Sequence, residues 1–513
     1  LHKEYRRQRQ MCIRDSEKID STLITQDLLI YAFGLYTMFE SPNSVWWIVP
    51  AQCEGAGIMR IMLIATNRHN RWMTRQEVRP LPIGLAYVAA YIDQSKHDLR
   101  MVDLMFSDDY LQHTEDIIKE FKPGLIGISI RNLDNGSYVN PQSALPLTKD
   151  VITRIRSCSE AIITCGGPAF SILPKECFKY LDPDIGLAGD AADTFAQLAD
   201  FFDTQNILRH QSLTNDILTE LNQVSGVVYQ QQHNIHVAEH RASSTLAEAP
   251  RLDELDLTQY RQAGFGVGVI TKLGWYQSTI EEPSKELNDP TANNDMRISN
   301  SVDQVIKEIQ RLKSQYNLGE FFFIDQAFNQ PPDFAKALCK SLIAANLDIK
   351  WNTNMSTDGS DSELISLMTQ AGCQMVLIGG PVISMQNDKN ESSGIESSLK
   401  QLINLCDLCH NQGLPYSITQ AFGEPGETDT TISIKLAGLS QVAGTERSAH
   451  VNMRIGNRLL PGSPLLNLAI QDGLINEETD LLMPVFYVEP SVKPHIVDTL
   501  KAAAEPNANW HIM

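Results

Sequence analysis

Short apolar runs alternate with amphipathic stretches along this chain, and that alternation limits its fold more than any other feature. In the first half, the apolar runs have the length of strands, and the stretches between them repeat apolar residues at helical spacing. We expect strands at 58–66, 99–104, 125–130, 161–167 and 184–190, and helices at 80–96, 109–121, 144–157 and 191–202. The pattern predicts an α/β domain with a doubly wound, mainly parallel, Rossmann-like sheet.

The alternation resumes in the second half with six further strand–helix units. The expected strands lie at 267–272, 320–325, 348–355, 374–380, 415–423 and 450–456, with helices at 301–316, 332–345, 361–371, 396–412 and 427–441 between them. Units of this kind, repeated in order, predict a partial βα barrel of the TIM type, whose active site lies at the carboxyl ends of its strands.

Changes of composition divide the chain into five segments. RQRQMCIRDS near the start resembles translated sequencing adaptor, and the acidic flank of the apolar stretch LLIYAFGLYTMF is wrong for a signal peptide. We therefore expect the first segment to be upstream or disordered sequence without a native role. The expected segments are 1–58 (upstream), 59–202 (first domain), 203–260 (linker with a small β insertion), 261–460 (barrel) and 461–513 (C-terminal extension packing on the barrel).

The bulk composition excludes several classes of partner. The formal net charge is −20 with a pI near 5.0, a field that repels nucleic acid and anionic membranes. No apolar run reaches the length that a membrane span needs. The nine cysteines are scattered and odd in number, which favours a reducing, cytoplasmic location. A small-molecule substrate or cofactor is the expected partner.

Polar residues and glycines follow the strands of the first domain where each strand ends. Ligands of doubly wound sheets bind beyond the carboxyl ends of the strands, and glycines there let the backbone approach a ligand closely. No G-x-G-x-x-G opens the first helix, so a dinucleotide is not expected. The candidate binding residues at this edge are Thr66, Asn67, Ser129, Arg131, Asn132, Asn135, Gly166, Gly167, Gly189 and Asp190.

Several motifs of both halves together resemble the cobalamin-binding radical SAM proteins. They are PLPIGLAYVAAYI, KPGLIGISIRNLDN, CGGPAFSILP and GLAGDAADTF in the first half, and FFFIDQAFNQPP, IKWNTN, AFGEPGET and RIGNRLLPGSPL in the second. The resemblance implies a cobalamin-binding domain followed by a radical SAM barrel over residues 59–513. The D-x-H-x-x-G signature is missing, since neither His69 nor His97 stands in that pattern. The resemblance therefore implies cobalamin without a histidine ligand.

The same resemblance implies an S-adenosylmethionine (SAM) pocket at the upper rim of the barrel. The positions in it are Lys272, Gly379, Gly380, Gly423 and Arg454. Asp325 and Glu424 stand at strand ends where an acid or base could act, although Asp325 could equally cap the following turn.

The chain departs from this family at the iron–sulfur cluster. Relatives carry C-x-x-x-C-x-x-C after the first barrel strand, and three thiolates leave the fourth iron of a [4Fe–4S] cluster open for SAM. Here Trp275, Thr279 and Glu282 stand at the three positions, and the nearest cysteines in sequence are Cys177 and Cys339. Tryptophan cannot ligate iron and glutamate is a hard ligand, so we expect the cluster to be absent.

Three functions stay open from the sequence. The first is a cobalamin- and SAM-dependent methyltransferase-like enzyme that works without the cluster. The second is a non-catalytic cobalamin sensor or pseudoenzyme partner of an intact radical SAM protein. The third is an ordinary radical SAM enzyme with atypical cluster ligation. Cys406-x-x-Cys409-His410 matches a haem attachment pattern, but it lies within an expected helix and is interpreted as core packing.

The expectation for the first segment can be tested by shortening the chain. A chain that begins at Met59 should unfold at the same urea concentration as the full chain, because residues 1–58 are expected to add no native core. Urea unfolding followed by circular dichroism measures the midpoint. A shortened chain that fails to fold would contradict the expectation.

Overall fold

A computed structural model gives the structure of the protein in two compact units, Leu1–Ile58 and Met59–Met513. In the first unit, strands β1 (Tyr36–Phe39) and β2 (Trp47–Pro50) pair antiparallel. The described residues are 59–69, 79–189, 192–207, 209–210, 213–239, 249–262, 267–273, 300–380, 391–444, 447 and 449–513, together with the strands at 36–39, 47–50 and 297–298.

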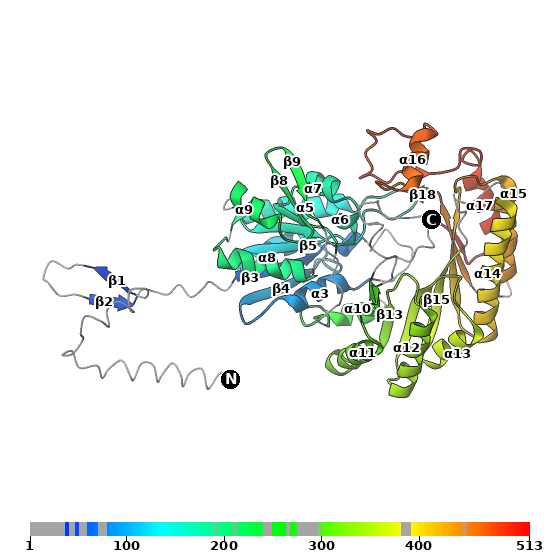
Figure 1. Cartoon of the computed structure of the whole chain (residues 1–513), viewed down its shortest axis with the longest axis horizontal. Coiled ribbons are helices and arrows are strands. Elements are labelled where there is room, and N and C mark those ends of the chain that lie inside the picture. Colours follow the sequence, from blue (N-terminus) through cyan, green and yellow to red (C-terminus); the bar gives the residue numbers. More distant parts are fainter. Residues whose placement is uncertain are drawn as a thin grey trace. The chain divides into compact units, whose positions relative to one another are not determined.

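A seven-stranded sheet forms the first domain (Figure 1). Its order is β4 (His97–Asp103), β3 (Met59–Ala65), β5 (Leu125–Ser129), β6 (Ile162–Gly166), β7 (Ile185–Leu187), β8 (Val227–Gln231) and β9 (Asn234–Val237). The first five of these strands pair parallel, as the sequence predicts. The hairpin β8–β9, which the sequence analysis assigns to a linker, instead extends this sheet antiparallel to β7.

Helices cover both faces of the first sheet. Helices α3 (Ile83–Tyr91) and α8 (Ala192–Thr204) pack on one face, and α4 (Tyr110–Phe121), α5 (Leu145–Cys158) and α7 (Pro174–Leu181) pack on the other. Two short helices, α6 (Pro168–Ile172) and α7, follow β6 where the sequence predicts none. Each begins with a proline, whose fixed φ suits the first turn of a helix.

A second sheet of seven strands, all parallel, forms the partial barrel. Its order is β10 (Val267–Val269), β13 (Glu320–Phe323), β14 (Lys350–Met355), β15 (Cys373–Gly379), β16 (Tyr416–Phe422), β17 (His450–Ile455) and β20 (Trp510–Ile512). The first six are the predicted strands. The seventh comes from the C-terminal segment, because Trp510 to Ile512 pair with Val451 to Met453.

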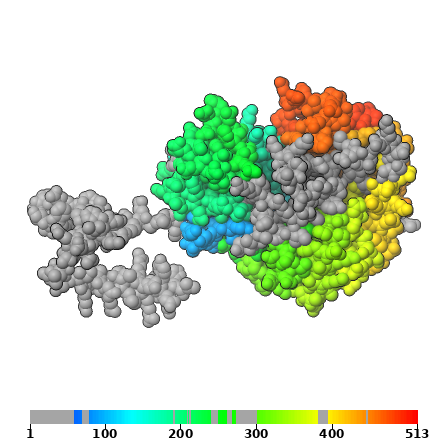
Figure 2. Space-filling view, viewed as in Figure 1, coloured from blue at the N-terminus to red at the C-terminus, as the bar shows by residue number. Residues whose placement is uncertain are grey.

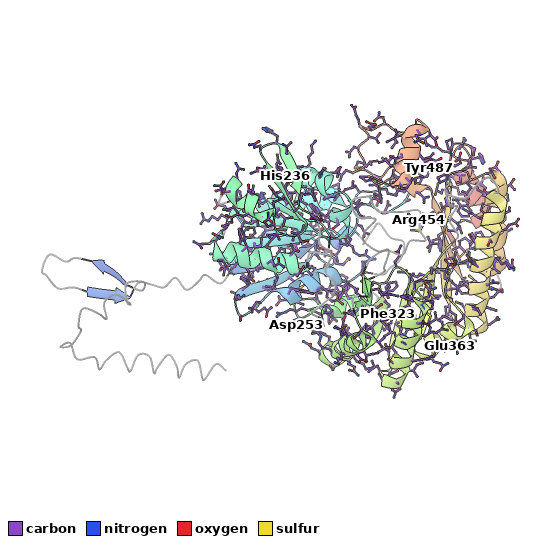
Figure 3. The ribbon with its side chains drawn as sticks, viewed as in Figure 1. His236, Asp253, Phe323, Glu363, Arg454 and Tyr487 are labelled. Carbon is purple, nitrogen blue, oxygen red and sulfur yellow. The ribbon has the colours of Figure 1, made fainter. Side chains whose placement is uncertain are left out.

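Helices cover the outer side of this sheet and form the green-to-yellow surface in Figure 2. Side chains such as Trp351, Val376 and Met453 point to these helices and are buried in the core. The alternate residues face the concave side and stay partly exposed, and Figure 3 shows Arg454 on that side and Glu363 outside. The helices are α11 (Val302–Tyr316), α12 (Pro332–Ala345), α13 (Ser362–Gln370), α14 (Glu391–Asn411) and α15 (Asp429–Ala443).

The two domains share one apolar core on the α3 side of the first sheet. At Gly268 an added Cβ would lie 3.2 Å from the Ile83 side chain, so the first barrel strand packs closely on α3. The Tyr87 hydroxyl donates to Glu308 of α11 over 2.8 Å. A further contact joins Tyr260 of α10 (Leu257–Gln262) to Asp103 at the end of β4.

The C-terminal segment binds the first domain as well as the barrel. Its elements are β18 (Asn457–Arg458), α16 (Pro464–Gln471), β19 (Phe486–Tyr487), α17 (Ile496–Ala504) and β20. Arg458 forms a 2.8 Å ion pair with Asp134 of the loop after β5, and the two side chains are only 9% and 7% exposed. The rings of Tyr138 and Phe486 pack edge to face at 6.0 Å. In the described part of the chain, no helix combines the length and apolar character that crossing a membrane requires.

The buried carboxyl group of Glu308 predicts a pH-dependent stability. Burial raises its pKa from 4.5 to about 7, so the folded chain keeps a proton that the unfolded chain releases above about pH 4.5. Stability from this group is therefore complete below pH 4.5 and falls as the pH rises to about 7. Replacing Glu308 by Gln keeps the acceptor for Tyr87 and removes the ionisation.

We expect Glu308→Gln to stabilise the chain at pH 8 by on the order of 3 kcal/mol, and to change its stability little at pH 4.5. Urea unfolding of parent and variant at both pH values measures the difference. Glu320→Gln, at an exposed carboxyl on β13, is the matched control and should be neutral at both. An equal effect of Glu308→Gln at the two pH values would contradict the assignment.

Candidate functional site

The carboxyl ends of β3, β5 and β6 lie side by side and bring several predicted residues together. Thr66 is buried and donates to the backbone carbonyl of Ser129 over 3.1 Å. The hydroxyl of Thr148 on α5 donates in turn to Thr66 over 2.9 Å. Asn67 is also buried, with its amide 3.5 Å from the carbonyl of Pro80. Thr66 and Asn67 therefore stabilise the carboxyl edge of the sheet through contacts with backbone carbonyls.

Glycines shape the surface of this edge. Gly167 has a φ of +103°, and a Cβ there would lie 2.7 Å from the backbone oxygen of Ile130, so a side chain does not fit. Gly189 has a φ of +87°, and its backbone N–H donates to Ser171 over 2.8 Å. The predicted residue Asp190, next to Gly189, lies outside the described residues.

A cavity of about 210 Å³ opens on the α3 and α8 face of the sheet. Ser129, Gly166, Gly167 and Gly189 are among its lining residues, so four predicted positions meet there. Apolar side chains form most of the wall, from Leu63, Leu85, Val88, Leu187 and Phe195. Gly127 makes room for it, because a Cβ at that residue would lie 2.7 Å from the Phe195 ring.

Sequence reasoning missed one polar residue of this cavity. Thr164 on β6 lines it and is 2% exposed, and its hydroxyl has no hydrogen-bond partner in the part of the chain that the structure describes. The run IITCGG is typical of a buried strand, and the polar threonine within this apolar run is the one sequence feature that points to a polar site residue.

The loop after β5 carries the remaining predicted residues of the first domain. Asn135 folds this loop, since its side chain donates to the Asn140 carbonyl over 2.8 Å and accepts from the backbone of Gln142 over 3.1 Å. Arg131 is exposed and Asn132 partly exposed, and their side chains lie 3.5 Å apart. Neither residue lines the cavity. Both belong to the segment held by the Arg458–Asp134 ion pair.

Lys272 and Asp325 meet where the first barrel strands end. The Lys272 ammonium donates to the carbonyls of Ala327, Phe328 and Gln330 at 3.0, 2.8 and 2.8 Å, and lies 3.4 Å from Asp325. Asp325 accepts from the backbone and hydroxyl of Thr271 at 3.0 and 2.5 Å. Both side chains are buried, and burial lowers the pKa of Lys272. Their contacts fix the turn after β13.

Glu424 is equally committed to structure. Lys435 of α15 lies 2.6 Å from Glu424 and 2.6 Å from Glu427, and all three side chains are buried. Burial lowers the pKa of Lys435, but the two carboxylates outweigh it and the net pKa is raised. Gly423, with a φ of +80°, donates its backbone N–H to Glu427. The motif GEPGE therefore forms a turn that the buried Lys435 ammonium stabilises.

The inner face of the barrel sheet carries polar, partly exposed side chains. Barrel interiors are usually filled by branched apolar side chains. Here the partly exposed inner positions include Asn352, Asn354, Thr419, Asn452 and Arg454. Gly379 is the last residue of β15, and Gly380 follows it at the same rim.

The described cysteines of the barrel lie away from this rim. Cys339 is on α12, Cys406 and Cys409 are on α14, and Cys373 begins β15 at the opposite end of the strand. All four are buried, and burial raises the pKa of Cys339 and of Cys409 to about 12. Among the described residues no group of three potential metal ligands gathers. The positions Trp275, Thr279 and Glu282 lie outside the described residues.

Comparison with known proteins finds a family match in the first domain. A family model of the B12 binding domain matches residues 77–199, which include α3, β4 to β7 and most of the cavity wall. Most residues of the cavity, including its glycines and Thr164, therefore lie in the part of the chain that matches this family model.

Three distant relatives carry the name of a methyltransferase. An uncharacterized methyltransferase of Pyrococcus horikoshii is 21% identical over 58% of this chain and 60% of its own length. A tryptophan 2-C-methyltransferase of Streptomyces laurentii is 21% identical over 74% of this chain and 70% of its own. Cytidylyl-2-hydroxyethylphosphonate methyltransferase of Streptomyces wedmorensis is 21% identical over 63% of each chain. The chain thus spans less than two thirds of the first and third of these relatives.

Solved structures share the fold over nearly the whole chain. The radical SAM methyltransferase TsrM of Kitasatospora setae, with cobalamin and a [4Fe–4S] cluster bound, has a TM-score of 0.69 at 17% identity and covers 89% of this chain and 93% of its own. OxsB, a cobalamin-dependent SAM radical enzyme, has a TM-score of 0.65 at 14% identity over 94% of this chain and 72% of its own. The predicted resemblance to cobalamin-binding radical SAM proteins is confirmed in the fold.

Lys435 provides a test of the buried charges at the rim. Lys435→Met leaves Glu424 and Glu427 buried without their cation, which should cost about 3–5 kcal/mol of folding free energy. Lys501→Met, at an exposed lysine of α17, should change stability little. Urea unfolding at pH 7 compares the two variants with the parent. A loss below about 1 kcal/mol for Lys435→Met would contradict the ion-pair assignment.

Proposed function

We propose that the chain is a cobalamin-binding, SAM-dependent methyltransferase that works without an iron–sulfur cluster. The observation that carries this proposal is the glycine-walled cavity of the B12-binding domain, which adjoins the first strand of a barrel whose inner face is polar and partly exposed. The barrel would hold SAM and a small-molecule substrate.

The residues of the first domain fit the nucleotide end of cobalamin. The cavity is far larger than the roughly 10–15 Å³ that one water needs, and it is too small for a corrin ring. An aromatic base suits its apolar wall, and the buried hydroxyl of Thr164 offers a polar contact. Glycines 166, 167 and 189 would let the backbone approach the linking phosphate and sugar closely. Arg131, Asn132 and Asn135 would face the corrin ring from the loop after β5.

Bound cobalamin would supply a cobalt that carries a methyl group between donor and acceptor. A methyl group leaves SAM as a cation equivalent, with both electrons of the carbon–sulfur bond staying on sulfur, so polar transfer needs no radical. Arg454, Gly379, Gly380 and Gly423 would bind the donor at the rim. Lys272, Asp325 and Glu424 would position this rim, since their side chains are held by backbone groups or ion pairs.

Loss of the cluster rests on the sequence and on the state of the cysteines. No cysteine stands between Cys177 and Cys339, and the segment that would carry the ligands reads TKLGWYQSTIEEP. The described thiols of the barrel are buried and have raised pKa values, so they are poor sources of thiolate. This disfavours atypical ligation by those cysteines.

A non-catalytic cobalamin carrier or sensor is the second candidate. The observation that favours it is that both predicted acid–base residues, Asp325 and Glu424, are buried and engaged in structural contacts. Such a carrier would bind cobalamin without turning over SAM, and it could serve an intact radical SAM partner.

Metal and cobalamin analysis of the anaerobically purified chain tests the proposal. After incubation with iron, sulfide and hydroxocobalamin, we expect about one cobalamin and no stoichiometric iron per chain. Reduction of the bound cobalamin and addition of SAM labelled at the methyl group should then transfer the label to cobalt. Binding without transfer would support the carrier. About four irons per chain would overturn the loss of the cluster.

A further inference from the structure

The cavity of the first domain contains a polar group that the fold itself does not use. Thr164 pairs in register with Gly127 on one side and Ile185 on the other, in the middle of the sheet. A buried hydroxyl without a partner costs about 1–3 kcal/mol, whereas valine has nearly the same shape and no such cost. A threonine at this position is therefore unfavourable for folding alone.

The other polar side chains of the wall are engaged or lie at its margin. The Tyr87 hydroxyl donates to Glu308 over 2.8 Å. Ser129 stands at the end of β5 and is partly exposed. Among the described lining residues, Thr164 alone has a buried side-chain oxygen without a hydrogen-bond partner. Because apolar side chains form most of the remaining wall, the cavity offers a ligand one buried side-chain hydroxyl and few other polar contacts.

We propose that this cavity selects corrinoids by their nucleotide base, preferring dimethylbenzimidazole to adenine, with the apolar wall as the discriminating surface and the Thr164 hydroxyl as the hydrogen-bond donor to the base. The inference rests on the proposed binding of cobalamin. Dimethylbenzimidazole presents one ring nitrogen that accepts a hydrogen bond, and the rest of its surface is apolar. One buried hydroxyl in an apolar cavity matches that pattern.

Adenine has the opposite balance of groups. It brings an exocyclic amine and further ring nitrogens, and most of these would be buried against Leu63, Leu85, Val88 and Phe195 without partners. Burying polar groups without hydrogen bonds is unfavourable. An apolar pocket discriminates against an added polar group by on the order of a hundredfold at most. We therefore expect a corrinoid with adenine to bind between about tenfold and a hundredfold more weakly than cobalamin.

Binding titrations of the full chain test this preference. Hydroxocobalamin and its adenine-containing counterpart would be titrated separately, and the visible absorbance change on binding would give each Kd. Thr164→Val should weaken cobalamin binding roughly fivefold, the worth of one hydrogen bond. It should weaken the adenine corrinoid by a similar factor, because the ring nitrogen that accepts from Thr164 has a counterpart in adenine, and the preference set by the apolar wall should remain.

Thr114→Val is the matched control. Thr114 of α4 is fully buried, and its hydroxyl donates to the Tyr110 carbonyl within the same helix over 2.7 Å, outside the cavity. This variant should keep the affinity of the parent for both corrinoids. Without corrinoid, Thr164→Val should also unfold at a higher urea concentration than the parent, since it removes a buried hydroxyl that lacks a partner.

Two outcomes would overturn the inference. Equal affinity of the parent for the two corrinoids would contradict the proposed base preference. Unchanged cobalamin affinity in Thr164→Val would contradict the proposed hydrogen bond from the Thr164 hydroxyl. Neither outcome touches the proposed function. Failure of the parent to bind any corrinoid would overturn the proposed function as well, so the two failures are distinguishable.

Discussion

The close packing of α3 against the first barrel strand is the contact on which the arrangement of both domains depends. Ile83 packs on Gly268, where a side chain would meet both Ile83 and Ile324. One turn further along α3, Tyr87 reaches Glu308 of the barrel helix α11. Tyr87 and Ile270 also line the cavity of the first domain. Ile270 belongs to the barrel, so the packing of the two domains helps to form the wall of this cavity.

Much of the fold follows from the sequence, because period and length decide between strand and helix. The five parallel strands of the first sheet and six of the barrel strands lie where the apolar runs predict them. The exceptions depend on distant contacts. The sequence of the hairpin β8–β9 does not predict that β8 pairs with β7. Strand β20 has only three residues, WHI, and follows a polar stretch. Short strands acquire their identity from the edge they join.

The candidate site was predictable in location and less so in the role of its residues. Ser129, Gly166, Gly167 and Gly189 line one cavity because parallel strands bring their carboxyl ends to one edge. Position alone could not separate an acid or base from a structural carboxylate. Asp325 and Glu424 both stand at strand ends. The groups that donate to Asp325 lie 53 and 54 residues away in the sequence, and the lysine that pairs with Glu424 lies 11 residues away. Thr164 could not be predicted as a site residue, because the sequence does not show whether a threonine inside a buried strand has a hydrogen-bond partner.

The last barrel strand has a consequence for how the chain is made. During synthesis, β17 is complete once residue 455 has been added, but its outer edge has no partner until residues 510–512 follow. At typical rates of about 5–20 residues per second, that edge stays open for a few seconds. An open edge strand is a template for pairing with other chains. Until residues 510–512 pair with β17, the nascent barrel therefore carries an open strand edge with which other chains can pair.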